Sequence, residues 1–191
     1  MHKGRLEAFS DGVIAIIITI MVLELRPPHG SDIHDLWPLL PALSSYVMSF
    51  VYVGIYWNNH HHLLQATECV NGRILWANLH LLFWLSLFPA VTAWLGEAGG
   101  TWPTAVYGAV LLMGGIAYHI LERTIVVHHG ADSTLARAVG MQDTKVNLSV
   151  ALVAIAIPLA FVHQWISDAV YAGVAAMWFV PDRRIESAVT R

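Results

Sequence analysis

Six long apolar segments follow one another along the chain, separated by short breaks rich in polar residues, proline or glycine. A helix needs about 20 apolar residues to cross the roughly 30 Å hydrocarbon core of a bilayer. Segments near this length predict membrane-spanning helices at residues 6–25, 39–64, 74–95, 103–127, 146–162 and 166–180. The pattern therefore predicts an all-α, polytopic membrane protein with six transmembrane helices, forming one domain over residues 1–191.

The distribution of basic residues predicts the orientation of these helices. Lys and Arg gather on the cytoplasmic side of membrane proteins. With six spans, nine of the ten basic residues lie on one side of the membrane and only Arg26 lies on the other. The nine are Lys3, Arg5, Arg73, Arg123, Arg137, Lys145, Arg183, Arg184 and Arg191. We therefore predict that both ends of the chain are cytoplasmic.

Composition supports the membrane assignment and excludes one class of partner. Hydrophobic residues make up 57% of the 191 residues and charged residues only 12%, with a mean hydropathy of +0.58. A soluble domain carries about 25% charged residues. The net charge of −3 leaves no basic face for a nucleic acid. The single cysteine, Cys69, excludes an internal disulfide.

Two charged residues lie at or inside the membrane boundary of the first predicted helix. Arg5 and Asp11 stand there, where a charge is costly and usually faces protein or water. Snorkelling of a long side chain to the cytoplasmic surface is enough to explain Arg5. Asp11 lies roughly two turns into the helix and has a short side chain, so a buried partner is the better explanation for it.

An apolar stripe runs along the same helix. Ile16, Ile20 and Leu23 stand at positions i, i+4 and i+7 and share one face, with Thr19 one step away. Symmetric copies of this stripe would form stacked apolar rings with a hydroxyl ring between them, and such constrictions can gate by dewetting. Stripes of this kind also occur on lipid-facing and helix-packing surfaces, so the pattern alone leaves both interpretations open.

The run His60-His61-His62 invites a metal site, but its spacing argues against one. Consecutive residues on a helix diverge by about 100°, so three adjacent histidines cannot easily bind one ion. No His-Glu-x-x-His pattern accompanies them. Haem ligation by His60 or His61 together with His80 is geometrically conceivable. No metal site or cofactor is expected.

A structural role suits these polar side chains better. Buried polar groups in a membrane need partners, and the first three helices supply both donors and acceptors. We expect a polar network that clamps these helices together, formed by Arg5, Ser10, Asp11, Trp57, His60, His61 and Asn78.

The first half of the chain resembles a known family. Arg5 followed by Phe9-Ser10-Asp11 matches the Arg-x-x-x-Phe-Ser-Asp signature of the lysosomal potassium channel transmembrane protein 175 and its bacterial relatives. The match continues through Gly12-Val13-Ile14-Ala15-Ile16 to Leu23-Glu24. It is also similar at Trp57-Asn58-Asn59-His60-His61, and in the Asn-led run from Asn78 to Pro89. The second half of the chain matches only in hydropathy and helix count.

The resemblance implies a channel rather than an enzyme. In this family four six-helix subunits surround a cation pore that the first helix lines, so it implies a homotetramer in the bilayer with potassium as the permeant ion and no cofactor. Carried onto this sequence, the pore positions are Ile16, Thr19, Ile20 and Leu23, and Phe9 joins the polar network as part of the signature. A plasma membrane location in a prokaryote is expected.

The chain lacks the Thr-Val-Gly-Tyr-Gly filter of ordinary potassium channels, so selectivity from side-chain rings is expected to be weak to moderate.

Two other functions remain open from the sequence. A proton-coupled secondary transporter could use Asp11 and a histidine as its titrating pair, although the chain shows no clear internal repeat. A His-ligated haem or metal oxidoreductase is the third possibility.

Overall fold

The structure is a computed structural model that describes residues 3–28, 30–67, 69–129 and 143–179. Every regular element in these ranges is a helix, and none is a strand. The elements are α1 (Lys3–Leu23), the 3₁₀ helix η1 (Ile33–Leu39), α2 (Leu40–Gln65), α3 (Gly72–Ser86), α4 (Phe88–Ala98), α5 (Thr101–His129), α7 (Asp143–Leu159) and α8 (Gln164–Phe179). The all-α fold is confirmed, and each of the six predicted helices has its counterpart.

The third predicted helix differs from the expectation because it is divided in two. Segment α3 ends at Ser86, and α4 begins at Phe88 with Pro89 in its first turn. Proline has no N–H group and is tolerated in the first turn of a helix but not in its interior. At the junction the Leu87 N–H donates to the Trp84 carbonyl at 3.3 Å, in a tighter turn than that of an α-helix. Hydropathy alone does not show this break, because the residues on both sides of it are apolar.

Four helical segments are long and apolar enough to cross a membrane within the described residues. They are Lys3–Leu23, Ile33–Gln65, Gly72–Ala98 and Thr101–His129. The last two helices are shorter, with 17 residues in α7 and 16 in α8. The chain is therefore a multi-pass membrane protein, and within the described residues α7 and α8 are shorter than the four candidate spans.

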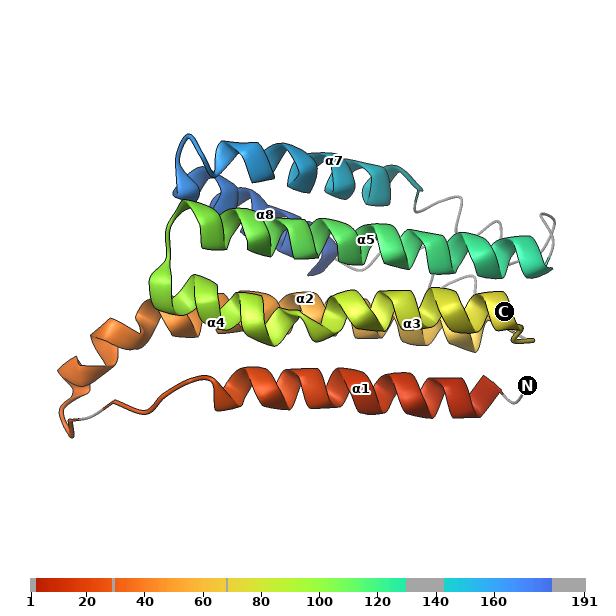
Figure 1. Ribbon diagram of the computed structural model, residues 1–191, viewed down its shortest axis with the longest axis horizontal. Coiled ribbons are helices and arrows are strands. Elements are labelled where there is room, and N and C mark those ends of the chain that lie inside the picture. Colours follow the sequence, from red (N-terminus) through yellow and green to blue (C-terminus); the bar gives the residue numbers. More distant parts are fainter. Residues whose placement is uncertain (1–2, 29, 68, 130–142, 180–191) are drawn as a thin grey trace.

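The helices lie side by side, with α1 at one edge of the subunit (Figure 1). Segments α2, α3 and α4 form the next layer, α5 follows, and α7 and α8 lie at the other edge. Helix α1 packs against α2, α3 and α4. The start of α1, the end of α2, the start of α3 and the end of α5 share one end of the molecule. We call this the basic end, because Lys3, Arg73 and Arg123 lie there.

The positions of the described basic residues agree with the prediction that successive loops lie on alternate sides of the membrane. Arg26 follows α1 at the opposite end, where its guanidinium lies 3.4 Å from the Glu97 carboxylate. The predicted cytoplasmic residues Arg137, Arg183, Arg184 and Arg191 lie outside the described residues.

Helices α2 and α4 approach each other closely at Gly96. A Cβ atom added at Gly96 would lie 2.7 Å from the Cα of Ala42, closer than real Cβ atoms come. Small residues let membrane helices approach closely and gain van der Waals contact. Glycine at position 96 is therefore what allows α4 to pack directly on α2.

Candidate functional site

Helix α1 has one buried face. Its buried residues are Leu6, Ser10, Ile14, Ile17 and Met21. They recur every three or four positions, which is the spacing of one helix face. This face carries the contacts of α1 with α2, α3 and α4, and it includes one polar residue, Ser10, which has no exposed surface.

The predicted pore residues lie on the exposed part of α1. Ile16 is 58% exposed, Ile20 41% and Leu23 79%, and Thr19 is exposed as well. The subunit therefore leaves an apolar stripe with a hydroxyl group uncovered along its edge. Val22 is also 44% exposed, but it points in another direction around the helix. The stripe is therefore defined by the direction that its residues share and not by their exposure alone.

The hydroxyl of Thr19 has a defined orientation. Its Oγ1 donates a hydrogen bond to the carbonyl of Ile16 at 2.9 Å. A hydroxyl carries one proton and two lone pairs, and this bond uses the proton. The lone pairs of Thr19 remain available on the exposed side, where an oxygen can replace a water molecule around a cation.

Asn78 of α3 joins three helices at a fully buried point. Its Nδ2 donates to Ser10 Oγ of α1 at 3.0 Å, and its Oδ1 accepts from His60 Nε2 of α2 at 2.7 Å. Because Oδ1 only accepts, Nε2 of His60 carries the proton. The three side chains are 0–1% exposed. We call Ser10, His60 and Asn78 the buried anchor.

A second polar contact lies nearer the surface. Trp57 Nε1 of α2 donates to Asp11 Oδ1 of α1 at 2.9 Å. The ring of His61 stacks on the Trp57 indole, with centroids 5.6 Å apart and planes 23° apart. Trp57 is 42% exposed. The hydrogen bonds among the predicted residues therefore fall into two groups, a buried one and an exposed one.

Two members of the predicted network stand apart within the subunit. Phe9 is 52% exposed, and Arg5 is exposed. Across the described residues, Arg5 has no hydrogen bond or ion pair to the anchor or to Asp11.

Two of the histidines that raised the question of haem or metal, His60 and His80, form hydrogen bonds. His60 binds Asn78 through Nε2, and His80 Nε2 accepts from Trp84 Nε1 at 3.0 Å. Within the described residues, no group of three or more His, Cys, Asp or Glu side chains is placed to hold a metal ion. The His60 bond connects α2 to α3, and the His80 bond lies within α3.

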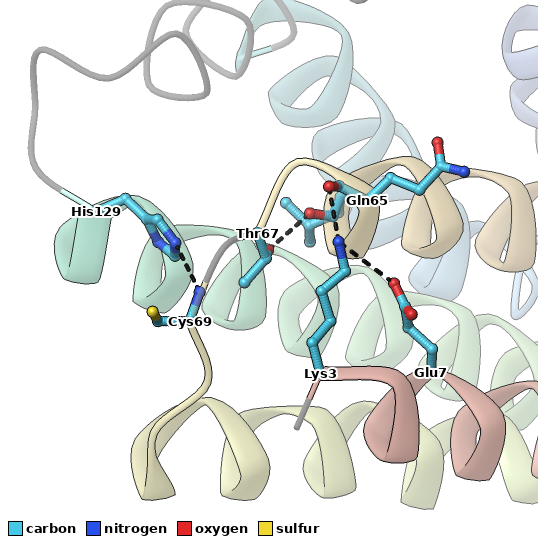
Figure 2. A network of polar contacts seen from close by, with 7 residues as sticks. Lys3, Glu7, Gln65, Thr67, Cys69 and His129 are labelled. Carbon is cyan, nitrogen blue, oxygen red and sulfur yellow. Dashed lines mark hydrogen bonds and ion pairs between the residues drawn. The ribbon is translucent and has the colours of Figure 1, made fainter. Parts of the chain in front are cut away.

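A hydrogen bond at the basic end also connects α1 to α2 (Figure 2). Lys3 Nζ donates to the Gln65 carbonyl at the end of α2 at 2.9 Å and lies 3.7 Å from Glu7 Oε1. On the loop after α2, the Cys69 N–H donates to His129 Nε2 of α5 at 3.4 Å. The first half of α1 is thus fixed by its end as well as by the buried anchor.

Sequence analysis missed a chain of buried polar groups at the other end of α1. Thr92 Oγ1 of α4 donates to Ser49 Oγ of α2 at 2.7 Å and lies 4.0 Å from Met21 Sδ of α1. Ser49 Oγ and Tyr107 Oη of α5 are 3.0 Å apart. Ser49 and Thr92 interrupt apolar runs at buried positions, which is the signal that marks them in the sequence.

The chain is similar to known proteins over nearly its whole length. Residues 5–89 match the family model described as the endosomal/lysosomal potassium channel TMEM175. A potassium channel of a Chryseobacterium species is 52% identical over 190 residues, which cover 99% of this chain and 98% of that protein.

A solved structure and an animal protein are also similar. The crystal structure of a lysosomal potassium-selective channel TMEM175 homologue from Chamaesiphon minutus superposes with a TM-score of 0.81, at 27% identity, over 92% of this chain and 95% of that chain. The human endosomal/lysosomal proton channel TMEM175 is 37% identical over 86 residues, covering 37% of this chain and 17% of that protein. The likeness to the bacterial proteins therefore extends over nearly their whole length.

Proposed function

The chain belongs to the TMEM175 family, and we propose that it forms a potassium-permeable cation channel whose pore is lined by α1. The bacterial relative that shares 52% of its residues is called a potassium channel. The similar Chamaesiphon structure is called potassium-selective. We therefore propose a transport function and not an enzymatic one.

The observation that carries the proposal is the uncovered stripe of α1. Ile16, Ile20 and Leu23 are exposed side chains of α1, and α1 is the helix at the edge of the subunit. Because one helix cannot enclose a pore, copies of the subunit must complete it, and closed rings are the usual solution. We propose a homotetramer, for which the expected native mass is four times 21.1 kDa plus bound lipid.

The stripe also suggests how ions are controlled. Rings of isoleucine and leucine form narrow apolar constrictions that exclude water, and a wetting transition would open them. A ring of Thr19 hydroxyls, with lone pairs free, would supply oxygen ligands between the apolar rings. Because single hydroxyls replace only part of a hydration shell, we propose weak to moderate selectivity for potassium over sodium.

The proposed location is the plasma membrane of a prokaryote, with both ends of the chain in the cytoplasm. A cysteine introduced at Ser31 or Glu97, in a Cys69→Ser background, should react with an impermeant thiol reagent added outside intact cells. A cysteine at Arg73, at the basic end, should react only after the cells are opened. The reverse labelling pattern would contradict the orientation that the Lys and Arg distribution predicts.

Ion flux into liposomes tests the function directly. Purified protein in potassium-loaded liposomes should release potassium faster than a transporter can turn over, while protein-free liposomes stay loaded. Sodium and proton gradients are compared in parallel, because the human relative is called a proton channel. Flux that saturates at a slow rate and requires a proton gradient would favour a proton-coupled transporter. No flux of potassium at all would overturn the proposal.

A further inference from the structure

An open hollow lies between α3 and α5 at the basic end, and its lining includes no residue of the stripe or of the buried anchor. Arg73, Trp76 and His80 of α3 line one side, and Ile120 and Thr124 of α5 line the other. Its lining contains no Asp or Glu. Trp76 is 76% exposed, one turn into α3, at the level where tryptophan meets the membrane interface.

Three side chains of the hollow, Arg73, Trp76 and His80, offer donors, whereas Thr124 offers only lone pairs because its Oγ1 donates to the Ile120 carbonyl at 2.6 Å. Arg73 is exposed, and across the described residues it forms no ion pair or hydrogen bond. The indole N–H of Trp76 likewise has no acceptor in the part of the chain that is described. His80 Nε2 accepts from Trp84, so Nδ1 carries the proton of the neutral ring. A guanidinium and two N–H groups with no carboxylate nearby suit an anion with several oxygens.

An apolar track continues from the hollow along α3. Trp76, Leu79 and Phe83 stand at i, i+3 and i+7 and are 76%, 42% and 56% exposed. From Arg73 to Phe83 the helix rises about 15 Å, which is about half of the hydrocarbon thickness. The track therefore has the length of a lipid chain in one leaflet and begins at the cationic group.

From this placement we propose that the hollow binds the headgroup of an anionic phospholipid of the cytoplasmic leaflet. The phosphate accepts hydrogen bonds from Arg73 and the Trp76 indole, and one acyl chain lies along Leu79 and Phe83. Basic pockets between membrane helices on the cytoplasmic side are suited to such headgroups. The site is separate from the ion path and needs no particular channel mechanism.

Charge complementarity favours a lipid over a second copy of the chain. A second copy would have to bring an acceptor to Arg73, yet three carboxylates of that end whose side chains are described are engaged. Glu7 pairs with Lys3, Asp11 accepts from Trp57, and Glu122 is buried at 2% exposure beside His119. A phospholipid supplies the anion and the apolar chains together.

Native mass spectrometry of the purified protein tests the site. Phosphatidylglycerol is titrated against phosphatidylcholine for the wild type and for Arg73→Gln, with Arg26→Gln as the matched control at the opposite end. Loss of one interfacial arginine should weaken phosphatidylglycerol binding about fivefold, because each such residue contributes about 1 kcal/mol. Phosphatidylcholine binding and the Arg26→Gln variant should change little. Equal phosphatidylglycerol binding by Arg73→Gln and wild type would refute the proposal.

A second measurement distinguishes a lipid in the hollow from a covering protein and from a free anion. A spin label at Trp76→Cys, in a Cys69→Ser background, should be accessible to oxygen dissolved in the lipid of vesicles made of phosphatidylglycerol and phosphatidylcholine. A label shielded from oxygen and from aqueous nickel alike would show that protein covers the hollow, and the lipid proposal would fail. Displacement of phosphatidylglycerol by millimolar inorganic phosphate would also overturn it, because a free anion would then occupy the site without acyl chains.

Discussion

The two halves of α1 are held in different ways. The half at the basic end is fixed by directed polar bonds, from Ser10 to Asn78, from Asp11 to Trp57 and from Lys3 to Gln65. The other half is held mainly by apolar packing, through Ile17 and Met21. Hydrogen bonds specify one orientation, whereas apolar contacts between membrane helices tolerate small rotations.

This difference explains how one half of the helix can orient the other. The bond between Ser10 and Asn78 forms at one rotation of α1 about its axis. At about 100° per residue, Ile16 and Leu23 then point roughly 120–140° away from Ser10. The buried anchor therefore turns the stripe outward, although none of its residues touches the stripe. In the proposed channel, the polar half sets the geometry and the apolar half meets the ion.

The largest expected effect comes from removing the centre of the buried anchor. Asn78→Ala leaves Ser10 and His60 without their partners, and two lost buried bonds should cost about 1–3 kcal/mol. We expect a lower thermal midpoint and less assembled protein in size-exclusion chromatography. Asn147→Ala is the matched control, because Asn147 is exposed on α7. Equal stability of the two variants would mean that directed bonds do not hold this half of α1.

The next effect concerns the apolar half. Ile16→Asn introduces an amide of similar length into the proposed constriction, so water should enter the ring and potassium flux should rise several-fold. The measurement is potassium release from liposomes, and selectivity over sodium should change with it. Val22→Asn provides the comparison, because Val22 is similarly exposed but points elsewhere. A flux that responds to Val22→Asn and not to Ile16→Asn would place the pore on another face.

A smaller effect is expected from Thr19→Val. Valine nearly keeps the shape of threonine and loses the oxygen whose lone pairs remain free after the bond to Ile16. The ratio of potassium to sodium flux should change, while the native mass stays that of the unmodified assembly. Thr19→Ser keeps the hydroxyl and should keep the ratio. An unchanged ratio in Thr19→Val would exclude the hydroxyl ring as a selectivity element.

The smallest effect is expected at the exposed polar contact. Trp57→Phe removes the donor to Asp11 at a half-exposed position, where water can replace it, so the loss of stability should be below about 1 kcal/mol. Asp11→Asn keeps an acceptor oxygen and should change stability less. Thermal unfolding measures both variants. A loss in Trp57→Phe as large as that in Asn78→Ala would show that the exposed group, not the buried one, is the anchor.

Much of the fold was predictable because membrane insertion depends on properties that add along the chain. Hydropathy located the helices to within a few residues, and the side on which Lys and Arg gather agrees with the end shared by Lys3, Arg73 and Arg123. The division of the third span at Leu87 was not predicted. Pro89 marked the place, but only the backbone geometry shows that the helix restarts there instead of bending.

The candidate site was predictable in its members and not in its connections. The sequence determined that Ser10, His60 and Asn78 are polar groups inside apolar helices, which must find partners. It could not determine which partners, because a hydrogen bond depends on distances of about 3 Å between helices that are far apart in sequence. Only the tertiary structure decided that Asn78 connects three helices and that Arg5 stands apart. For the same reason, the hydrogen bonds that connect Thr92 through Ser49 to Tyr107 form only when the helices are packed. The hollow beside Arg73 likewise depends on the packing of the helices.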